Sequence, residues 1–276
     1  MSRVRSPSIA HFQEKTPMSF IESVLLGMLQ ALTEFFPISS SAHLKILKHF
    51  LGLQNLESYV LLDLSCHFGT LCALAIFLRK EITSLFFEEK KKLLLFFLAL
   101  IPLIPFYFLL KPLREIASEK QFLGFCLIGS GLILLAGQFL RMPRSKNKKP
   151  SKKIQDVLMI GALQSAALIP GISRSGATIS CARILGWSAK DAVRFSFLLS
   201  IPTIIGGNAI ELLKTASSSE IHSTPIAGLF TAFATSFLLG LLIVGKAIRF
   251  LEKGNLKIFG WYCLILGSAA ALYFNL

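Results

Sequence analysis

Hydroxyl, basic and glycine residues gather at one point of an otherwise strongly apolar chain, the segment PGISRSGATIS from Pro170 to Ser180. The Pro-Gly break exposes the N-terminus of a following helix, whose first amides lack intrahelical partners and carry partial positive charge. Arg174 adds a full charge with a planar fork suited to phosphate oxygens, and Gly171 lets the backbone approach a ligand closely. Further donors come from the hydroxyl groups of Ser173, Ser175 and Thr178. The segment therefore predicts an anion-binding site, of the kind formed where helix N-termini meet phosphates.

A second segment, TEFFPISSSAHL at 33–44, repeats this arrangement, with Ser39 and Ser40 at the start of a helix after the proline. Ser40 is the best candidate for a nucleophile, because His43 lies three residues later on the same helix face. Glu34 acts either as a base or as the ligand of a divalent cation, and Mg²⁺ suits a site with few carboxylates plus substrate oxygens. In a rival mechanism a water activated by Glu34 or His43 attacks directly. The sequence leaves both mechanisms open.

Structural interpretations of the same residues also stay open. Arg174 is alternatively an arginine that extends to the membrane interface, Glu34 a helix-end carboxylate paired with a lysine, and His43 a hydrogen-bonded packing residue. Gln30 lies among apolar residues and needs a partner, so we expect it to support the site. Two polar residues one turn apart either support the site as well or bond only between helices, Asp63 and His67.

The composition places these residues in a membrane protein. The 276-residue chain is 53% hydrophobic and 16% charged, whereas a soluble domain is about a quarter charged, and its mean hydropathy is +0.64. Apolar runs of about 20 residues are long enough to cross a bilayer as helices. The predicted spans are 60–78, 93–110, 121–140, 192–213, 225–245 and 258–276.

Both polar segments lie where shorter apolar stretches are broken. Residues 21–36 and 39–51 are too short to span singly, and so are 154–169 and 173–185. Each pair predicts a re-entrant helical hairpin, since a backbone break at membrane depth is tolerated only inside protein or beside a wet cavity.

The two hairpins also resemble each other in sequence. GMLQALTEFFPISSS at 27–41 parallels GALQSAALIPGISRS at 161–175, and LALIPLI parallels LLSIPTI further on. We predict an all-α polytopic membrane protein made of two repeats, 18–140 and 154–276, each with one re-entrant hairpin and three spans. Three spans is an odd number, so the second repeat is inverted and the two hairpin tips can meet near the midplane. Two anion-attracting tips that face each other suit a diphosphate.

Charge predicts the orientation of the spans. Most of the 29 lysine and arginine residues fall on one side, above all in the loop 141–153, which is therefore expected in the cytoplasm with both termini outside. We interpret this basic loop as a topological signal and expect no nucleic-acid partner. Residues 1–17 are interpreted as a disordered tail, with Met18 as an alternative start.

The pair QALTEFFPISSSAHL and PGISRSGATIS resembles the two motifs of the undecaprenyl-diphosphatase family, the bacitracin-resistance type of bacterial membrane phosphatase. The likeness covers almost the whole chain from about residue 18. It implies removal of the terminal phosphate from a C55 polyprenyl diphosphate in the bacterial inner membrane, which recycles the carrier lipid for peptidoglycan synthesis. The first motif is matched by Gln30, Glu34, Pro37, Ser39, Ser40 and His43, and the second by Pro170, Gly171, Ser173, Arg174, Ser175 and Thr178. The first position of the family motif takes Glu or Gln.

We accordingly expect four catalytic residues, with Glu34 also as the metal ligand: Glu34, Ser40, His43 and Arg174. Substrate-binding roles are expected for Gln30, Ser39, Gly171, Ser173, Ser175 and Thr178. Mg²⁺ is the expected cofactor, the site is expected to open outward, and a homodimer is left open as the assembly. The alternative function is a lipid flippase or secondary transporter, because inverted repeats with broken helices are typical of transporters.

Overall fold

Helices make up the regular structure of the computed structural model, which describes residues 19–53, 59–142, 154–216 and 225–276. Six helical stretches are long and apolar enough to cross a membrane. They are α3 (Val60–Phe77), α5 with α6 (Lys90–Leu100 and Leu103–Leu109), α8 (Lys120–Phe139), α11 (Ala189–Ala216), α12 (Ile226–Glu252) and α13 (Lys257–Asn275). All six coincide with predicted spans, which confirms the polytopic helical membrane fold. The predicted tail 1–17 and most of the loop 141–153 lie outside the described residues.

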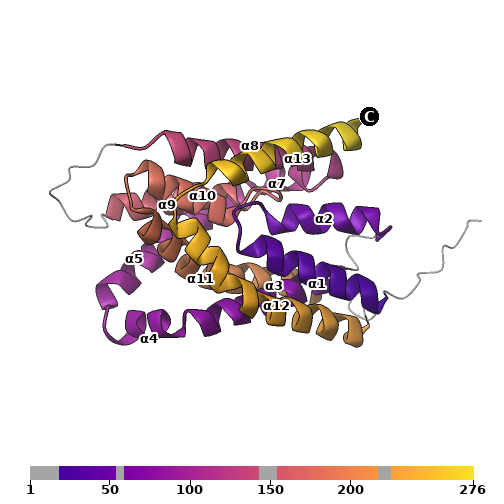
Figure 1. Cartoon of the computed structure of the whole chain (residues 1–276), viewed down its shortest axis with the longest axis horizontal. Coiled ribbons are helices and arrows are strands. Elements are labelled where there is room, and N and C mark those ends of the chain that lie inside the picture. The colour runs from indigo at the N-terminus through magenta and orange to yellow at the C-terminus, as the bar shows by residue number, and fades with distance from the viewer. Residues whose placement is uncertain (1–18, 54–58, 143–153, 217–224) are drawn as a thin grey trace, which may run out of the picture.

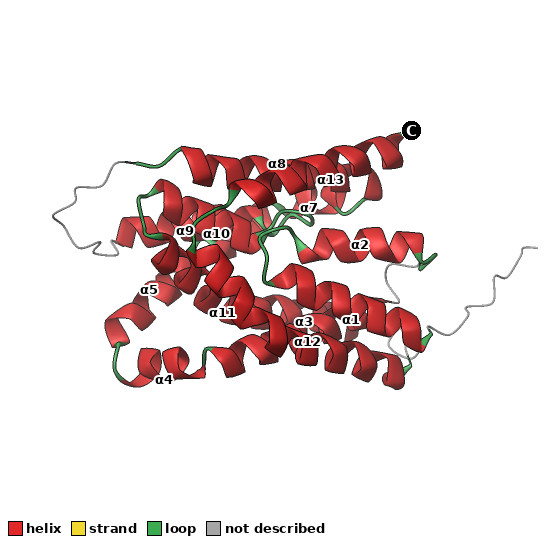
Figure 2. Cartoon of the chain, in the orientation of Figure 1, coloured by secondary structure: helices red, strands yellow, loops and turns green. Residues whose placement is uncertain are grey.

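Two pairs of shorter helices form the predicted hairpins. The first pair is α1 (Phe20–Glu34) and α2 (Ser40–Phe50), and the second is α9 (Ile154–Ala166) and α10 (Arg174–Ile184). With 11 to 15 residues each, these helices are shorter than the roughly 20 residues of a span. In Figure 1, α1 and α9 enter the molecule from opposite ends, and Figure 2 shows the break between α1 and α2 in the middle.

The two hairpin tips touch each other. A Cβ atom placed on Gly176, in the first turn of α10, would lie 3.4 Å from the carbonyl oxygen of Pro37 in the break of the first hairpin. The hairpins are also exchanged between the halves, since α1 packs against α12 and α9 packs against α5.

Close helix packing holds this frame together. α3 packs against α12, and a Cβ on Gly69 of α3 would lie 2.1 Å from Ser236 Oγ of α12. α8 packs against α13, where a Cβ on Gly124 would lie 2.3 Å from the backbone nitrogen of Ala271. Small residues let membrane helices approach closely, so these two pairs form the walls between which the hairpins sit.

Two short helices were not predicted from the sequence, α4 (Arg79–Phe87) and α7 (Lys111–Ala117). α4 follows directly on α3, and α7 begins with a proline near its N-terminus, Pro112, where the missing N–H costs nothing. The second span is interrupted between α5 and α6 at Pro102, because proline cannot donate the helical hydrogen bond. These interruptions turn α6 and α7 toward the cavity described below.

Candidate active site

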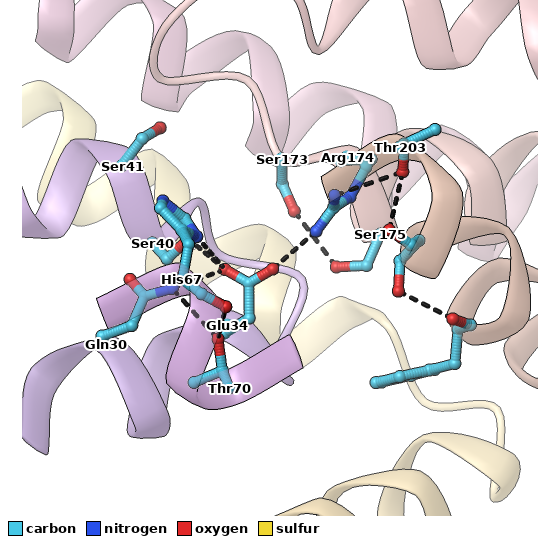
Figure 3. A network of polar contacts seen from close by, with 12 residues as sticks. Gln30, Glu34, Ser40, Ser41, His67, Thr70, Ser173, Arg174, Ser175 and Thr203 are labelled. Carbon is cyan, nitrogen blue, oxygen red and sulfur yellow. Dashed lines mark hydrogen bonds and ion pairs between the residues drawn. The ribbon is translucent and has the colours of Figure 1, made fainter. Parts of the chain in front are cut away.

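Glu34 and Arg174 form an ion pair across the two hairpin tips. Glu34 ends α1 and Arg174 begins α10, and Arg174 Nη2 lies 2.5 Å from Glu34 Oε1. The side chain of Glu34 is 6% exposed and that of Arg174 is 24% exposed. Figure 3 shows the two side chains pointing toward each other from opposite hairpins. Ionisable groups at membrane depth are costly and usually functional, so this pair marks the site.

The second oxygen of Glu34 accepts a hydrogen bond from the candidate nucleophile. Ser40 Oγ donates to Glu34 Oε2 at 2.6 Å, and Gln30 Nε2 donates to the same oxygen at 3.0 Å. The hydroxyl hydrogen of Ser40 therefore points at a buried carboxylate. This is the geometry required of a serine and its general base.

His67 of α3 completes the surroundings of Glu34. Its Nδ1 lies 3.4 Å from Glu34 Oε2 and accepts from Gln30 Nε2 at 2.7 Å. Gln30 also reaches Thr70 Oγ1 at 3.5 Å, so it links α1 to α3. The sequence left the role of His67 open, and the structure brings it to the site. Asp63 instead pairs with Lys48 at 2.6 Å.

Both ring nitrogens of His43 form hydrogen bonds with groups other than the Ser40 hydroxyl. Its Nδ1 donates to the carbonyl oxygen of Ser39 at 2.8 Å, which leaves Nε2 to accept from the hydroxyl of Tyr262 at 2.8 Å. The two rings stack with centroids 5.7 Å apart. His43 is also absent from the lining of the cavity. One turn beyond the tip, its ring is directed to α13, where it anchors the first hairpin.

The second hairpin tip is shaped by hydrogen bonds from Ser173. Its Oγ accepts from the N–H of Gly176 at 3.1 Å and caps α10, while its N–H donates to Ser130 Oγ at 2.9 Å. Ser130 Oγ in turn donates to the carbonyl oxygen of Gly171 at 3.1 Å. α8 thus fixes the tip of the second hairpin from the side.

Two residues expected to bind substrate face the protein instead. Gly171 has a φ of 98°, which favours glycine, and a Cβ there would lie 2.6 Å from that of Cys126. Thr178 Oγ1 lies 2.6 Å from Ser196 Oγ and donates to the carbonyl oxygen of Arg174 at 3.0 Å. Neither residue lines the cavity, and nor does Gln30, a third residue that was expected to bind substrate and is fully buried. Gly171 makes the turn, and Thr178 packs the tip against α11.

The serines of the first hairpin sit on a strained backbone. Ser39 has a φ of 67°, the only positive value for a non-glycine residue in the described part of the chain. Such strain persists where the surroundings fix it and gathers at functional sites. Ser39 Oγ lies 3.3 Å from Ser41 Oγ, and Figure 3 shows Ser41 apart from the Glu34 network.

Two residues on neighbouring elements were missed as site residues. Thr203 of α11 accepts from Arg174 Nη1 at 3.3 Å, and the LLSIPTI repeat was a signal that could have found it. Gln164 of α9 is buried and lines the cavity, and neither polar atom of its side chain has a hydrogen-bond partner within the described residues. An unpaired buried amide is costly, so Gln164 is available to a ligand.

A cavity of about 760 Å³ connects these residues. Its inner end holds Glu34, Ser39, Ser40, Ser41, His67, Gln164, Ser173, Arg174, Ser175 and Thr203. Its walls are mainly apolar, from Leu100, Leu103, Ile104, Phe108, Leu168, Ile172, Pro202 and Ile210. Lys214 lies 11 residues beyond Thr203 on α11, about 16 Å at the rise of a helix, so the other end of the cavity carries Tyr107, Arg114, Glu211 and Lys214. A few convergent polar groups at the head of an apolar cavity are typical of a ligand site.

Fold and site together define a polytopic membrane protein in which the ion pair of the two hairpin tips lies at one end of a mainly apolar cavity. The family model for the bacitracin resistance protein BacA matches residues 23–269, so the chain belongs to this family. It is 40% identical to an undecaprenyl-diphosphatase of Protochlamydia amoebophila, over 94% of this chain and 100% of that relative. Relatives with the same name from Persephonella marina and Geobacter sulfurreducens are 32% and 33% identical, each over 93% of this chain and 99% and 98% of their own lengths. The family suggested by the two motifs is confirmed.

Proposed function

We propose that the protein hydrolyses undecaprenyl diphosphate to undecaprenyl monophosphate and inorganic phosphate in the bacterial inner membrane. The relatives carry this activity in their names. The single observation that supports it most is the contact chain Ser40–Glu34–Arg174 at the head of an apolar cavity. A diphosphate headgroup fits the polar end, and the apolar walls suit the first units of a polyprenyl chain.

Binding begins with the second hairpin. Arg174 offers its guanidinium fork to the terminal phosphate, and the free amides of the first turn of α10 face the same charge. Thr203 holds Nη1 of Arg174 at 3.3 Å, while Ser173 and Ser175 border the cavity beside it. Arg174 then stabilises the charge that develops on the transferring phosphoryl group.

Ser40 is the nucleophile in the mechanism that the contacts favour. Its Oγ attacks the terminal phosphorus, its proton passes to Glu34 Oε2 across the existing 2.6 Å hydrogen bond, and the bond to the bridging oxygen breaks. Glu34 gives this proton to the leaving undecaprenyl monophosphate and is again a carboxylate. It then takes a proton from a water that attacks the phosphoserine, the bond between Ser40 Oγ and phosphorus breaks, Glu34 returns that proton to Ser40 Oγ, and inorganic phosphate leaves. Direct attack by a water deprotonated by Glu34 is the rival.

A divalent cation is proposed beside Glu34. Bound diphosphate brings negative charge next to this buried carboxylate, and Mg²⁺ commonly binds one or two carboxylates together with substrate phosphates. No group of three or more His, Cys, Asp or Glu suited to a metal occurs in the described ranges, so the substrate would supply most ligands. Bound there, the ion would neutralise phosphate charge.

The cavity is proposed to open on the outer face. Its second end is built by α7 and by the C-terminal end of α11. The chain passes from α7 into α8, whose C-terminal end lies at the opposite end of the molecule in Figure 1 and comes directly before the basic loop 141–153 in the sequence. The positive-inside rule assigns that loop to the cytoplasm. The cavity mouth is then outside, on the same side as both termini.

The test is release of phosphate by the purified protein in detergent, where there is no bilayer to cross. We expect undecaprenyl diphosphate to yield equimolar monophosphate and inorganic phosphate, with less turnover after a chelator and recovery on adding Mg²⁺. Absence of release over varied metal and pH would favour the flippase or transporter alternative.

A further inference from the structure

The mouth of the cavity, which is the end formed by α7 and the C-terminal part of α11, carries a second cluster of cationic groups. These groups are distant in sequence from the hairpin tips. Arg114 comes from α7, Lys214 from the end of α11 and Tyr107 from α6, and all three line the cavity. None of them belongs to either sequence motif, and the mechanism above does not use them.

Tyr107 orients the guanidinium of Arg114. The carbon Cζ of Arg114 lies 4.1 Å above the centre of the Tyr107 ring, and Nη2 donates to the carbonyl oxygen of Tyr107 at 3.1 Å. Stacking on an aromatic face fixes the plane of a guanidinium. The ammonium of Lys214 lies 5.9 Å from the same ring centre. One ring thus gathers two positive charges from different helices.

The charge at this mouth is incompletely balanced. Glu211 pairs with Lys214 at 3.1 Å. In the part of the chain that the structure describes, Arg114 has no carboxylate partner, and its Nε is buried without an acceptor. The nearby carboxylate of Glu115 pairs with Lys111 instead. One positive charge therefore remains to attract an anion. Low-dielectric walls of a cavity focus the electrostatic field of such a charge.

We propose that Arg114 and Lys214, oriented by Tyr107, form a second phosphate-binding position at the mouth of the cavity. Arg114 supplies a planar fork and Lys214 a point charge, the two ways in which proteins bind phosphate oxygens. The position lies at the opposite end of the same cavity from Arg174. An arriving lipid diphosphate headgroup would meet this position before it reaches the hairpin tips. Departing inorganic phosphate would meet the same position last, before it enters the water outside. The role of this second position in turnover rests on the proposed function, but the binding of phosphate there does not.

Binding is tested by protection of Lys214 from an amine-reactive reagent, read by mass spectrometry on the full-length protein in detergent. We expect inorganic phosphate to slow the labelling of Lys214 about tenfold, and to do so equally in Arg174→Ala, which lacks the inner arginine. Arg114→Gln should abolish the protection, and Arg114→Lys should retain part of it, because the charge remains and the fork is lost. Lys111 on the same short helix is exposed and does not line the cavity, so its labelling is the internal control and should not respond. Labelling of Lys214 that is indifferent to phosphate would overturn the proposal.

Kinetics then distinguish the two sources of phosphate. If the mouth receives the headgroup, Arg114→Gln should raise KM for the lipid about tenfold with kcat unchanged and weaken the dependence on salt. If it serves the departing product, KM should stay constant while inhibition by added inorganic phosphate weakens by a similar factor. Lys111→Gln is the matched control and should match the unaltered protein in both respects. An Arg114→Gln protein that equals this control in KM, salt dependence and phosphate inhibition would contradict a role of the mouth in turnover. If the unaltered protein does not hydrolyse undecaprenyl diphosphate, the proposed function is refuted. The protection of Lys214 by inorganic phosphate would still stand.

Discussion

Ser40 Oγ and Glu34 Oε2 lie 2.6 Å apart on either side of the break between α1 and α2. A residue at the end of one half-helix and a residue at the start of the next are thus brought into contact by the turn between them. Oε1 of the same carboxylate contacts Arg174 from the opposite hairpin. The proposed nucleophile, base and phosphate ligand therefore form one chain of contacts across the tips.

Replacement of Ser40 by alanine separates the two mechanisms. If Ser40 is the nucleophile, turnover should fall by at least about 10³-fold, whereas binding of the lipid should persist because Arg174 remains. Rapid quenching of the unaltered protein with labelled substrate should trap a phosphoserine at position 40. Ser41→Ala is the control, since Ser41 also lines the cavity but bonds to Ser39 and not to Glu34. Substantial activity in Ser40→Ala would favour direct attack by water.

Replacement of Arg174 by alanine should remove about 3–4 kcal/mol of transition-state stabilisation, the scale of a lost charge-stabilising donor. Lysine should recover only part of this, because the fork is lost. Thr203→Val should have a smaller effect in the same direction, since it removes the acceptor that holds Nη1. The measurement is kcat/KM for phosphate release. Arg194→Ala is the control, because Arg194 pairs with Glu252 away from the cavity. Near-normal turnover in Arg174→Ala would be incompatible with this site.

Gln164 and Gln30 occupy matching places in the two repeats, and their replacements should behave differently. Gln30 donates to Glu34 and His67, so Gln30→Leu should lower both activity and thermal stability. Gln164 has no partner to lose among the described residues. We expect Gln164→Leu to leave thermal stability unchanged or higher and to raise KM. A clear loss of stability without any change in KM would show that Gln164 is a packing residue.

His43 should act through its bond to Tyr262 and not through proton transfer. Tyr262→Phe removes only the hydroxyl that meets Nε2. If His43 anchors the hairpin, His43→Ala and Tyr262→Phe should lower kcat in the same direction, and the double variant should be no worse than His43→Ala. The pH dependence of kcat should keep its shape in both. Full activity in Tyr262→Phe together with inactive His43→Ala would restore a direct catalytic role to His43.

The parts of the molecule that local sequence patterns determine could be predicted from the sequence. The hairpins and spans follow from the lengths of apolar runs and from the breaks at Pro37 and Pro170, and Glu34, Ser40 and Arg174 follow from their places beside those breaks. His67 was harder to predict, because its span carries no sign of which face turns toward the hairpin tips. The LLSIPTI repeat marked the place of Thr203 but not the direction of its side chain.

Thr178 and Gly171 were predicted to face a ligand but face the protein, because a local sequence pattern does not show how a helix or a turn directs each residue. Thr178 lies one turn into α10, and the helix rotates its side chain toward Ser196 and away from the cavity. Gly171 was expected to admit a ligand, but its positive φ and its contact with Cys126 serve the turn itself. The mouth residues Arg114 and Lys214 are about a hundred positions apart and carry no motif, so only the fold brings them together.

The orientation of the cavity can be measured by labelling single cysteines. All five native cysteines are free, so a cysteine-free background requires no disulfide to be broken. Ile210→Cys tests the cavity, because Ile210 lines it near the mouth. Lys80→Cys tests the other side, since Lys80 is exposed on α4, within the segment 79–92 that the charge distribution predicts to be cytoplasmic.

A membrane-impermeant thiol reagent applied to intact cells should label Ile210→Cys and leave Lys80→Cys unlabelled until the cells are opened. Undecaprenyl diphosphate should protect Ile210→Cys, because a bound lipid fills the cavity and excludes the reagent. Labelling of Lys80→Cys in intact cells would invert the topology derived from charge. If Ile210→Cys is labelled only in opened cells while Lys80→Cys behaves as expected, the topology would stand and the cavity would face the cytoplasm.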